Sequence, residues 1–157
     1  MKKIFSPWID REEYMCFGCS PKNDHGLKME FFEDGDDIVS IWKPTSYAQG
    51  WVKTLHGGIQ CTLMDEVGGW VITRKLQTAG VTSKLDAKFI KSISTEEPQL
   101  TIRSRIKEQK RNAVFLEAEI YNSKGEVCAS ANMLYFTMSK EKALQEFSFI
   151  ECKTEDE

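Results

Sequence analysis

The longest apolar run of the chain lies near its middle, between Leu55 and Ile72. Drawn as a helix, this run carries apolar side chains on every side, which is typical of a helix enclosed by the rest of a protein. We therefore predict a buried helix over residues 57–76, with the other elements packed around it.

Alternation of apolar and polar residues predicts strands on both sides of this helix. The expected strands cover residues 27–32, 38–43, 82–90, 99–107, 114–120 and 127–138. The last is the most apolar and suits the centre of a sheet. Two strands, one long helix and four more strands predict an α+β fold, with an antiparallel sheet of about six strands wrapped around one long central helix.

The chain has 157 residues, which is the length of one domain with a single core. We expect an N-terminal segment packed on the domain at residues 1–26, the domain itself at 27–140 and a C-terminal extension at 141–157. A short helix is expected at residues 139–147. The acidic end of the extension, residues 154–157, is expected to fray.

Composition excludes several classes of partner. The formal net charge of −3 gives no basic surface of the kind that binds nucleic acid. No apolar run reaches the roughly 20 residues of a membrane span, and the N-terminus lacks the apolar region and cleavage site of a secretion signal. We expect a cytoplasmic protein that binds neither nucleic acid nor a membrane. Its five cysteines, an odd number, do not form the pattern of a disulfide framework.

Two acids, Asp65 and Glu66, interrupt the apolar helix. Burying a carboxylate is costly, so acids in a core helix are either satisfied by structure or kept for chemistry. Neighbours on a helix point about 100° apart. The two acids are therefore expected to face different surroundings, and where one carries the chemistry the other is a structural or interface acid.

The helix begins with Gly57-Gly58. The first N–H groups of a helix have no internal partner, and the helix dipole favours negative charge at this end. Glycines leave those N–H groups unshielded. The pair therefore predicts a site that binds an oxyanion.

Two arrangements of cysteine residues suggest chemistry, and each also has a structural interpretation. Cys16-Phe-Gly-Cys19, with His25 nearby, has the spacing of a zinc or redox motif. A closed zinc site needs four ligands and no second pair follows, so we expect a structural loop and no metal. Cys61 near His56 suggests a thiol nucleophile, but a small buried side chain is the preferred interpretation.

The predicted arrangement resembles the hotdog fold. His56-Gly57-Gly58, the acid at Asp65 and the segment at residues 82–91 resemble the phenylacetyl-CoA-thioesterase-like branch of the hotdog-fold acyl-CoA thioesterases. The segments at residues 16–19 and 23–27 are similar to the N-terminal part of one subgroup. The resemblance implies hydrolysis of an acyl-CoA thioester to a free acid and CoA.

The resemblance also implies residue roles. The Gly57 N–H would hold the thioester carbonyl oxygen, and Asp65 would act as general base or nucleophile. His56 would orient the loop or the substrate, and Thr82 would position water. Hydrolysis needs such donors and such a base, because negative charge builds up on the carbonyl oxygen.

Substrate contacts are expected around these groups. Some relatives have an amide side chain six residues before the histidine, where this chain has Gly50, and Gln49 is the candidate substitute. The other candidate substrate-binding residues are Gly58, Ser83, Lys88, Lys91, Lys110 and Arg111, the basic ones as partners for CoA phosphates. Strand parity favours Ser83 over Thr82 on the face shared by Leu85. No cofactor is expected beyond the CoA of the substrate.

Two other functions remain open at this point. One is a hotdog domain that binds or senses acyl-CoA without catalysis. The other is a dehydratase acting on hydroxyacyl thioesters, for which we find no obvious histidine and aspartate pair in the helix region.

The helix geometry predicts an assembly. Gly57 and Asp65 lie eight residues apart, which is about 12 Å along a helix and too far for both to act on one carbonyl carbon. Two chains with antiparallel helices would bring Gly57 of one near Asp65 of the other. We expect a homodimer or a dimer of dimers.

Overall fold

The computed structural model describes residues 1–157. Its strands are β1 (Lys2–Lys3), β2 (Phe32–Asp34), β3 (Asp37–Trp42), β4 (Gly80–Phe89), β5 (Leu100–Lys110), β6 (Ala113–Tyr121) and β7 (Val127–Thr137). Its helices are η1 (Ser46–Ala48), α1 (Gly57–Val71), η2 (Ile72–Leu76) and α2 (Lys140–Phe147). Because η2 continues α1 as a π-helical turn, the helix expected over residues 57–76 is confirmed.

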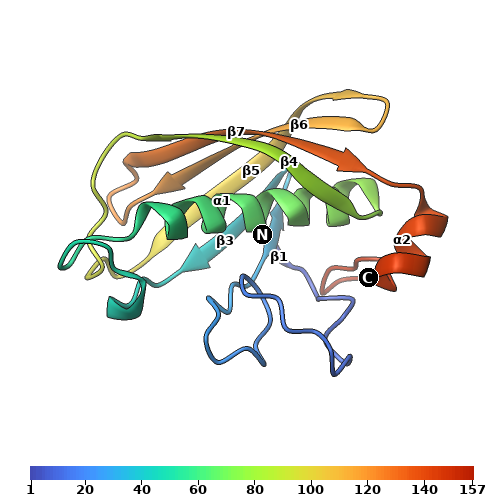
Figure 1. Ribbon diagram of the computed structural model, residues 1–157, viewed down its shortest axis with the longest axis horizontal. Helices are drawn as coiled ribbons and strands as arrows, with labels where there is room; N and C mark the ends of the chain where they lie inside the picture. The colour runs from blue at the N-terminus through green and yellow to red at the C-terminus, as the bar shows by residue number, and fades with distance from the viewer.

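All seven strands form one antiparallel sheet in the order β1-β2-β3-β5-β6-β7-β4. The sheet curves around α1, and the chain N-terminal to β2 covers the opposite side of the helix (Figure 1). This is the hotdog fold predicted from the sequence. The seventh strand is β1, two residues that pair with β2.

Helix α1 is buried because both layers pack on it. Its side chains Leu63, Met64 and Val67 have no exposed surface in the core that the sheet completes. On the other side, the ring of Trp70 stacks on Phe31, with centroids 4.7 Å apart. Apolar neighbours therefore cover two sides of the helix. On its remaining side Cys61, Thr62 and Asp65 are only partly buried, so the expected enclosure is incomplete within one chain.

The first predicted strand is wrong in position. Residues 27–31 are not part of the sheet, because Leu27 and Met29 donate their N–H groups to the carbonyl oxygens of Phe17 and Gly18, at 2.8 and 2.9 Å. Lys28 between them has a left-handed φ of 52°, which a regular strand does not allow. The segment is tied to the N-terminal loop, and pairing with β3 begins only at Phe32.

Two further expectations are corrected. Strand β7 lies between β6 and β4, one position from the edge, and β5 occupies the middle of the sheet. The acidic C-terminus does not fray, because Thr154 is 2% exposed and pairs with Ile4. A carboxylate oxygen of Glu157 lies 2.9 Å from a guanidinium nitrogen of Arg74. No helix combines the length and the apolar character required to span a membrane.

Candidate active site

The carboxylate of Asp65 lies where α1 faces the end strands of the sheet. Its Oδ1 accepts a hydrogen bond from the Thr82 hydroxyl of β4 at 2.8 Å and another from the Tyr135 hydroxyl of β7 at 2.5 Å. Thr82 and Tyr135 are cross-strand partners in the β4–β7 ladder. Two adjacent strands therefore orient one carboxylate oxygen, and no protein hydrogen bond occupies Oδ2.

Tyr135 is a fixed donor at this site. Its side chain is 2% exposed, and its hydroxyl also lies 2.6 Å from the main-chain oxygen of Asp65. Burial, and then the nearby charge of Asp65, raise the pKa of Tyr135 well above its ordinary value. The hydroxyl therefore stays protonated and donates to the carboxylate.

Gly68, one turn after Asp65, makes room for this contact. A Cβ at Gly68 would lie 2.9 Å from Met133 Cε and 3.1 Å from the Tyr135 hydroxyl oxygen. Both distances are shorter than ordinary carbon contacts, so any larger residue would press on the tyrosine. A glycine in the middle of α1, which costs helix stability, is explained by this close approach.

The expectation from strand parity is wrong at residues 82 and 83. The β4–β7 register shifts between Thr82 and Lys84, where β4 contains a bulge. The extra residue turns Thr82 toward Asp65 and leaves Ser83 exposed. Simple alternation cannot predict this result, because a bulge moves every preceding side chain to the other face.

The N-terminus of α1 provides the predicted donor. His56 caps the helix, with its Nδ1 accepting from the Gly58 N–H at 2.9 Å. The Gly57 N–H has no acceptor within the chain. A Cβ at Gly57 would meet only the Phe89 ring, at 3.6 Å. Of the two glycine N–H groups, Gly57 is thus free for a ligand and Gly58 is used by the cap.

The loop before α1 positions His56. The His56 N–H donates to the Ala48 carbonyl oxygen at 2.9 Å, and Gly50 lies so close that a Cβ there would be 3.4 Å from His56 Cα. Gln49 is exposed, and its Oε1 accepts from the Lys53 N–H at 3.3 Å. In this chain the side-chain oxygen of Gln49 therefore accepts a hydrogen bond within the loop before α1.

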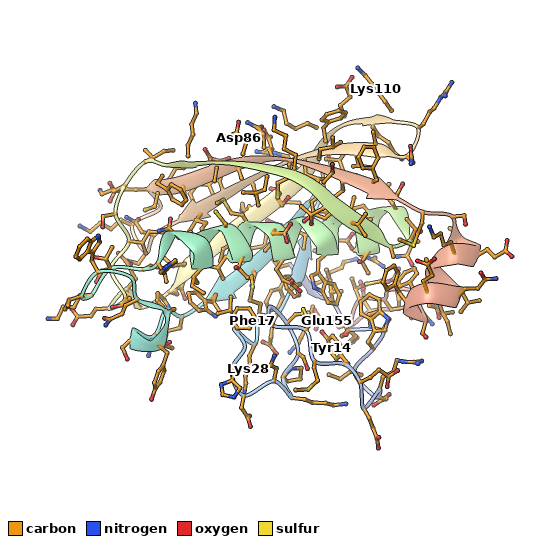
Figure 2. All side chains as sticks on the ribbon, viewed as in Figure 1. Tyr14, Phe17, Lys28, Asp86, Lys110 and Glu155 are labelled. Carbon is orange, nitrogen blue, oxygen red and sulfur yellow. The ribbon has the colours of Figure 1, made fainter.

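The basic candidates fall into two groups at opposite ends of the β4–β7 pair. Lys88 and Lys91 lie near the start of α1, next to Phe89, and Lys91 pairs with Glu126. Lys110 and Arg111 lie at the β5–β6 turn, beside the end of β7 that pairs with the start of β4. Figure 2 shows Lys110 at this turn, on the outer side of the sheet.

Cys61 lies one turn before Asp65 on α1 and is half-buried. Burial, and then the charge of Asp65, raise the pKa of the Cys61 thiol. A nucleophilic cysteine needs the opposite shift. The structure therefore supports the interpretation of Cys61 as a packing residue.

Sequence reasoning missed Tyr135. It lies within the last predicted strand, residues 127–138, and was not singled out there. The available signal was the hydroxyl itself, because a buried tyrosine normally needs a hydrogen-bond partner. Which partner it meets depends on the strand register.

Residues 52–129 match the sequence profile of the thioesterase superfamily. No curated protein matches the chain.

Solved structures share its fold. A hypothetical thioesterase from Streptococcus pneumoniae TIGR4, crystallised with coenzyme A, is 23% identical, with 71% of this chain and 90% of that chain covered and a TM-score of 0.66. The protein smu.793 from Streptococcus mutans UA159, bound to acetyl CoA, is 18% identical over 71% and 90%, with a TM-score of 0.64. The E. coli PaaI protein from the phenylacetic acid degradation operon is 17% identical over 73% and 82%, with a TM-score of 0.66.

Proposed function

The chain belongs to the thioesterase superfamily through residues 52–129, and from this premise we propose that it hydrolyses an acyl-CoA thioester, with Asp65 and the Gly57 N–H as its reacting groups. The observation that carries the proposal is an acid in the core helix held by two hydroxyl donors from the sheet. A carboxylate oriented through one oxygen presents its second oxygen for chemistry.

The chemistry requires a base and an oxyanion donor. Asp65 takes a proton from water as the water oxygen attacks the carbonyl carbon, or attacks that carbon itself as a nucleophile. The carbonyl oxygen becomes negative and is stabilised by the free Gly57 N–H at the positive end of α1. The carbon–sulfur bond then breaks, and the sulfur leaves as the CoA thiol after taking up a proton, which in the general-base route is the one that Asp65 took from water. In the nucleophilic route the acyl group stays on Asp65 as a mixed anhydride, which water hydrolyses to the free acid and the Asp65 carboxylate.

His56 and Thr82 support these two groups. His56 accepts from Gly58 and so leaves Gly57 as the donor that faces outward. Thr82, together with Tyr135, sets the direction of the Asp65 carboxylate and hence the position of the attacked carbon or the bound water. These are positioning roles, because both residues act through a neighbour.

The site requires two chains. Gly57 and Asp65 lie on one continuous helix, about 12 Å apart along its axis. An antiparallel two-fold dimer would place Gly57 of one chain near Asp65 of the partner. The exposed side chains of Tyr47 and Trp51, 98% and 85% accessible in the loop before α1, are candidates to contact the partner or the acyl group.

The compared structures support this substrate class. Coenzyme A and acetyl CoA are bound to two proteins of the same fold. For the Streptococcus pneumoniae protein, structures were also determined with an aspartate and with a threonine replaced by alanine. On this chain, Lys88, Lys91, Lys110 and Arg111 are the proposed partners of the CoA phosphates.

The test combines two inactive variants. Asp65→Asn removes the base and should lower turnover by about 10² to 10⁴. Gly57→Pro removes the N–H donor and should lower it by about 10² to 10³. Proline suits the first position of a helix, and His56, with ψ of 133°, already has the backbone required before proline. The assay is release of free thiol from a panel of acyl-CoAs.

Each variant has a matched control. Gly57→Ala keeps the N–H and makes only the ordinary contact with Phe89. Asp86→Asn changes an exposed acid on the outer face of β4 (Figure 2). Both controls should retain the parent rate.

Refolding the two inactive variants together tests the shared site. Half of the dimers formed at random are heterodimers, and each has one intact site of two, so about one quarter of the parent activity should return. Proven heterodimers without activity would show that each site is built from one chain. Parent protein that binds acyl-CoA without releasing thiol would instead favour a binding or sensing domain.

A further inference from the structure

A second cluster of reactive side chains lies on the other side of α1. The sulfur atoms of Cys16 and Cys19 and the carboxylate of Glu66 lie within 4.8 Å of one another. The Cys16 Sγ is 3.3 Å from Glu66 Oε1. The cysteines belong to the N-terminal segment, and Glu66 belongs to the core helix. Their proximity is therefore a product of tertiary packing.

The cluster is closely built. A Cβ at Gly18, between the cysteines, would lie 2.4 Å from Glu66 Cδ, so only glycine lets the loop come this close. The loop backbone is held by the Ser20 N–H, which donates to the Cys16 carbonyl oxygen at 3.1 Å. The Met29 N–H donates to the Gly18 carbonyl oxygen in the same way, at 2.9 Å. The sulfur atoms are thus presented from a fixed turn.

Outer contacts orient the same three groups. The Trp70 indole N–H donates to Glu66 Oε1 at 3.3 Å. The Tyr14 hydroxyl lies 2.8 Å from the Cys19 sulfur. Figure 2 shows Tyr14 on the side of α1 away from the sheet. Metal ligands are commonly held by such outer hydrogen bonds.

The Glu66 carboxylate has no cationic partner. Lysine and arginine side chains form ion pairs throughout the molecule, but none pairs with Glu66. The Cys16 thiol donates a hydrogen bond to it in place of a cation. A divalent metal with an affinity for sulfur would displace the thiol protons and balance the carboxylate and the two resulting thiolates.

We propose that Cys16, Cys19 and Glu66 bind a zinc ion, which fastens the N-terminal segment to the core helix. Zinc takes sulfur ligands at about 2.3 Å and carboxylate oxygens at about 2.0–2.2 Å in a tetrahedron. The edges of that tetrahedron are about 3.5–3.8 Å long. The 3.3 Å separation of Cys16 Sγ and Glu66 Oε1 is already close to this length, and the full cluster needs to contract by about 1 Å at most.

The fourth ligand position faces a cavity. A cavity of about 620 Å³ is lined by all three proposed ligands and by Tyr14, Gly69 and Trp70 among others. Three protein ligands with one open position is the arrangement in which zinc keeps a water or binds a small ligand. The site therefore holds zinc with an exchangeable fourth ligand on its cavity side. It is separate from the proposed hydrolytic site, because Glu66 and Asp65 point to different sides of α1.

The test measures metal content and needs no activity assay. Full-length protein, purified without chelator, should contain about one zinc per chain by elemental mass spectrometry. After the metal is removed, Co²⁺ should restore binding with the absorption bands of a tetrahedral thiolate site. Cys16→Ser and Cys19→Ser should abolish these bands. Glu66→Gln should weaken cobalt affinity by about 10-fold to 100-fold or more.

Controls separate a metal site from a folding effect. Cys61→Ser, a cysteine outside the cluster, and Asp65→Asn, the neighbouring acid, should keep the metal stoichiometry of the parent. Circular dichroism checks the fold of each variant, and Glu66→Gln tests the site without altering the loop.

Three results would overturn the proposal. The first is parent protein that contains no zinc and gives no thiolate bands with cobalt. The second is cobalt bands that persist in the double cysteine variant. The third is a Cys16–Cys19 disulfide, seen by mass, whose reduced form binds no cobalt.

Discussion

Asp65 and Glu66 are adjacent acids on one helix, yet their surroundings share almost nothing. Asp65 faces the end of the sheet, where the hydroxyl groups of Thr82 and Tyr135 donate to it. Glu66 faces the N-terminal segment, where it meets the Cys16 thiol and the Trp70 indole. Hydroxyl donors orient a carboxylate for proton transfer, whereas sulfur neighbours add ligands for a soft metal. A rotation of about 100° along a helix is enough to give two adjacent acids different partners, and the two proposed functions follow from that difference.

The comparison also shows how a layered fold uses its central helix. One layer against α1 is the sheet. The pairing register of its strands fixes the face on which each side chain lies, except where a bulge shifts that register. The other is a loop segment held by main-chain hydrogen bonds. A reacting acid needs the stiffer support, and in this molecule the acid assigned to catalysis is the one that faces the strands.

Among changes to the surroundings of the two acids, the largest effect is expected from the donors to Asp65. Tyr135→Phe or Thr82→Val each removes one hydrogen bond to a charged group, worth about 1.5–3 kcal/mol, so kcat should fall by about 10 to 100-fold. KM should change little, because neither hydroxyl is assigned a substrate contact. Steady-state kinetics with the best acyl-CoA provide the measurement.

Thr82→Ser is the matched control, since it keeps the hydroxyl and should stay near the parent rate. If Tyr135→Phe and Thr82→Val retain full kcat, the two hydroxyl groups serve packing alone. The difference between the surroundings of Asp65 and Glu66 would then not explain why Asp65 is the acid assigned to hydrolysis.

A third acid, Glu33, extends the comparison of Asp65 and Glu66 to the pH dependence of folding stability. Glu33 on β2 pairs with Arg74 and Lys75, at 2.9 and 2.5 Å. Burial by itself would raise the pKa of Glu33, but the hydrogen bonds and charges of Arg74 and Lys75 hold it below its ordinary value of about 4.5. A lowered folded-state pKa gives stability that is present above pH about 4.5 and is lost as pH falls through the folded value.

Glu33→Gln should therefore lower the free energy of unfolding by roughly 1–3 kcal/mol at pH 7. It should also show less further loss than the parent on acidification from about pH 5 to 3. Urea unfolding at several pH values measures both effects. The exposed Glu12, changed to glutamine, is the control. Equal acid sensitivity in the Glu33→Gln variant and the parent would exclude this ion-pair cluster as a source of the pH dependence.

The smallest effects concern the glycine pair that follows the two acids. A Cβ at Gly69 meets nothing within 4 Å, whereas one at Gly68 presses on Met133 and Tyr135. Gly69→Ala should raise the free energy of unfolding by up to about 1 kcal/mol, the helix propensity gained. Gly68→Ala should lack this gain and should reduce kcat, because it displaces Tyr135 from Asp65.

Thermal unfolding and steady-state kinetics of the two alanine variants provide the comparison. If Gly68→Ala were as stable and as active as Gly69→Ala, the helix would not depend on close approach of the tyrosine at this position.

The sequence by itself determined the central helix, its start at Gly57, and the succession of strands along the chain on either side of it. It could do so because these features are local: an apolar circumference, period-two alternation and a helix start can be recognised within one segment. The choice of Asp65 over Glu66 for hydrolysis rested on resemblance and stays a prediction.

Only the tertiary structure decided which groups meet. Tyr135 reaches Asp65 across 70 positions of the chain, and the bulge in β4 brings Thr82 to the same carboxylate. Glu66 meets Cys16 across 50 positions and supplies the third ligand that the cysteine spacing alone did not predict. Such contacts depend on strand register and on layer packing, because each is set by the sum of distant interactions and leaves no periodic signal in the sequence.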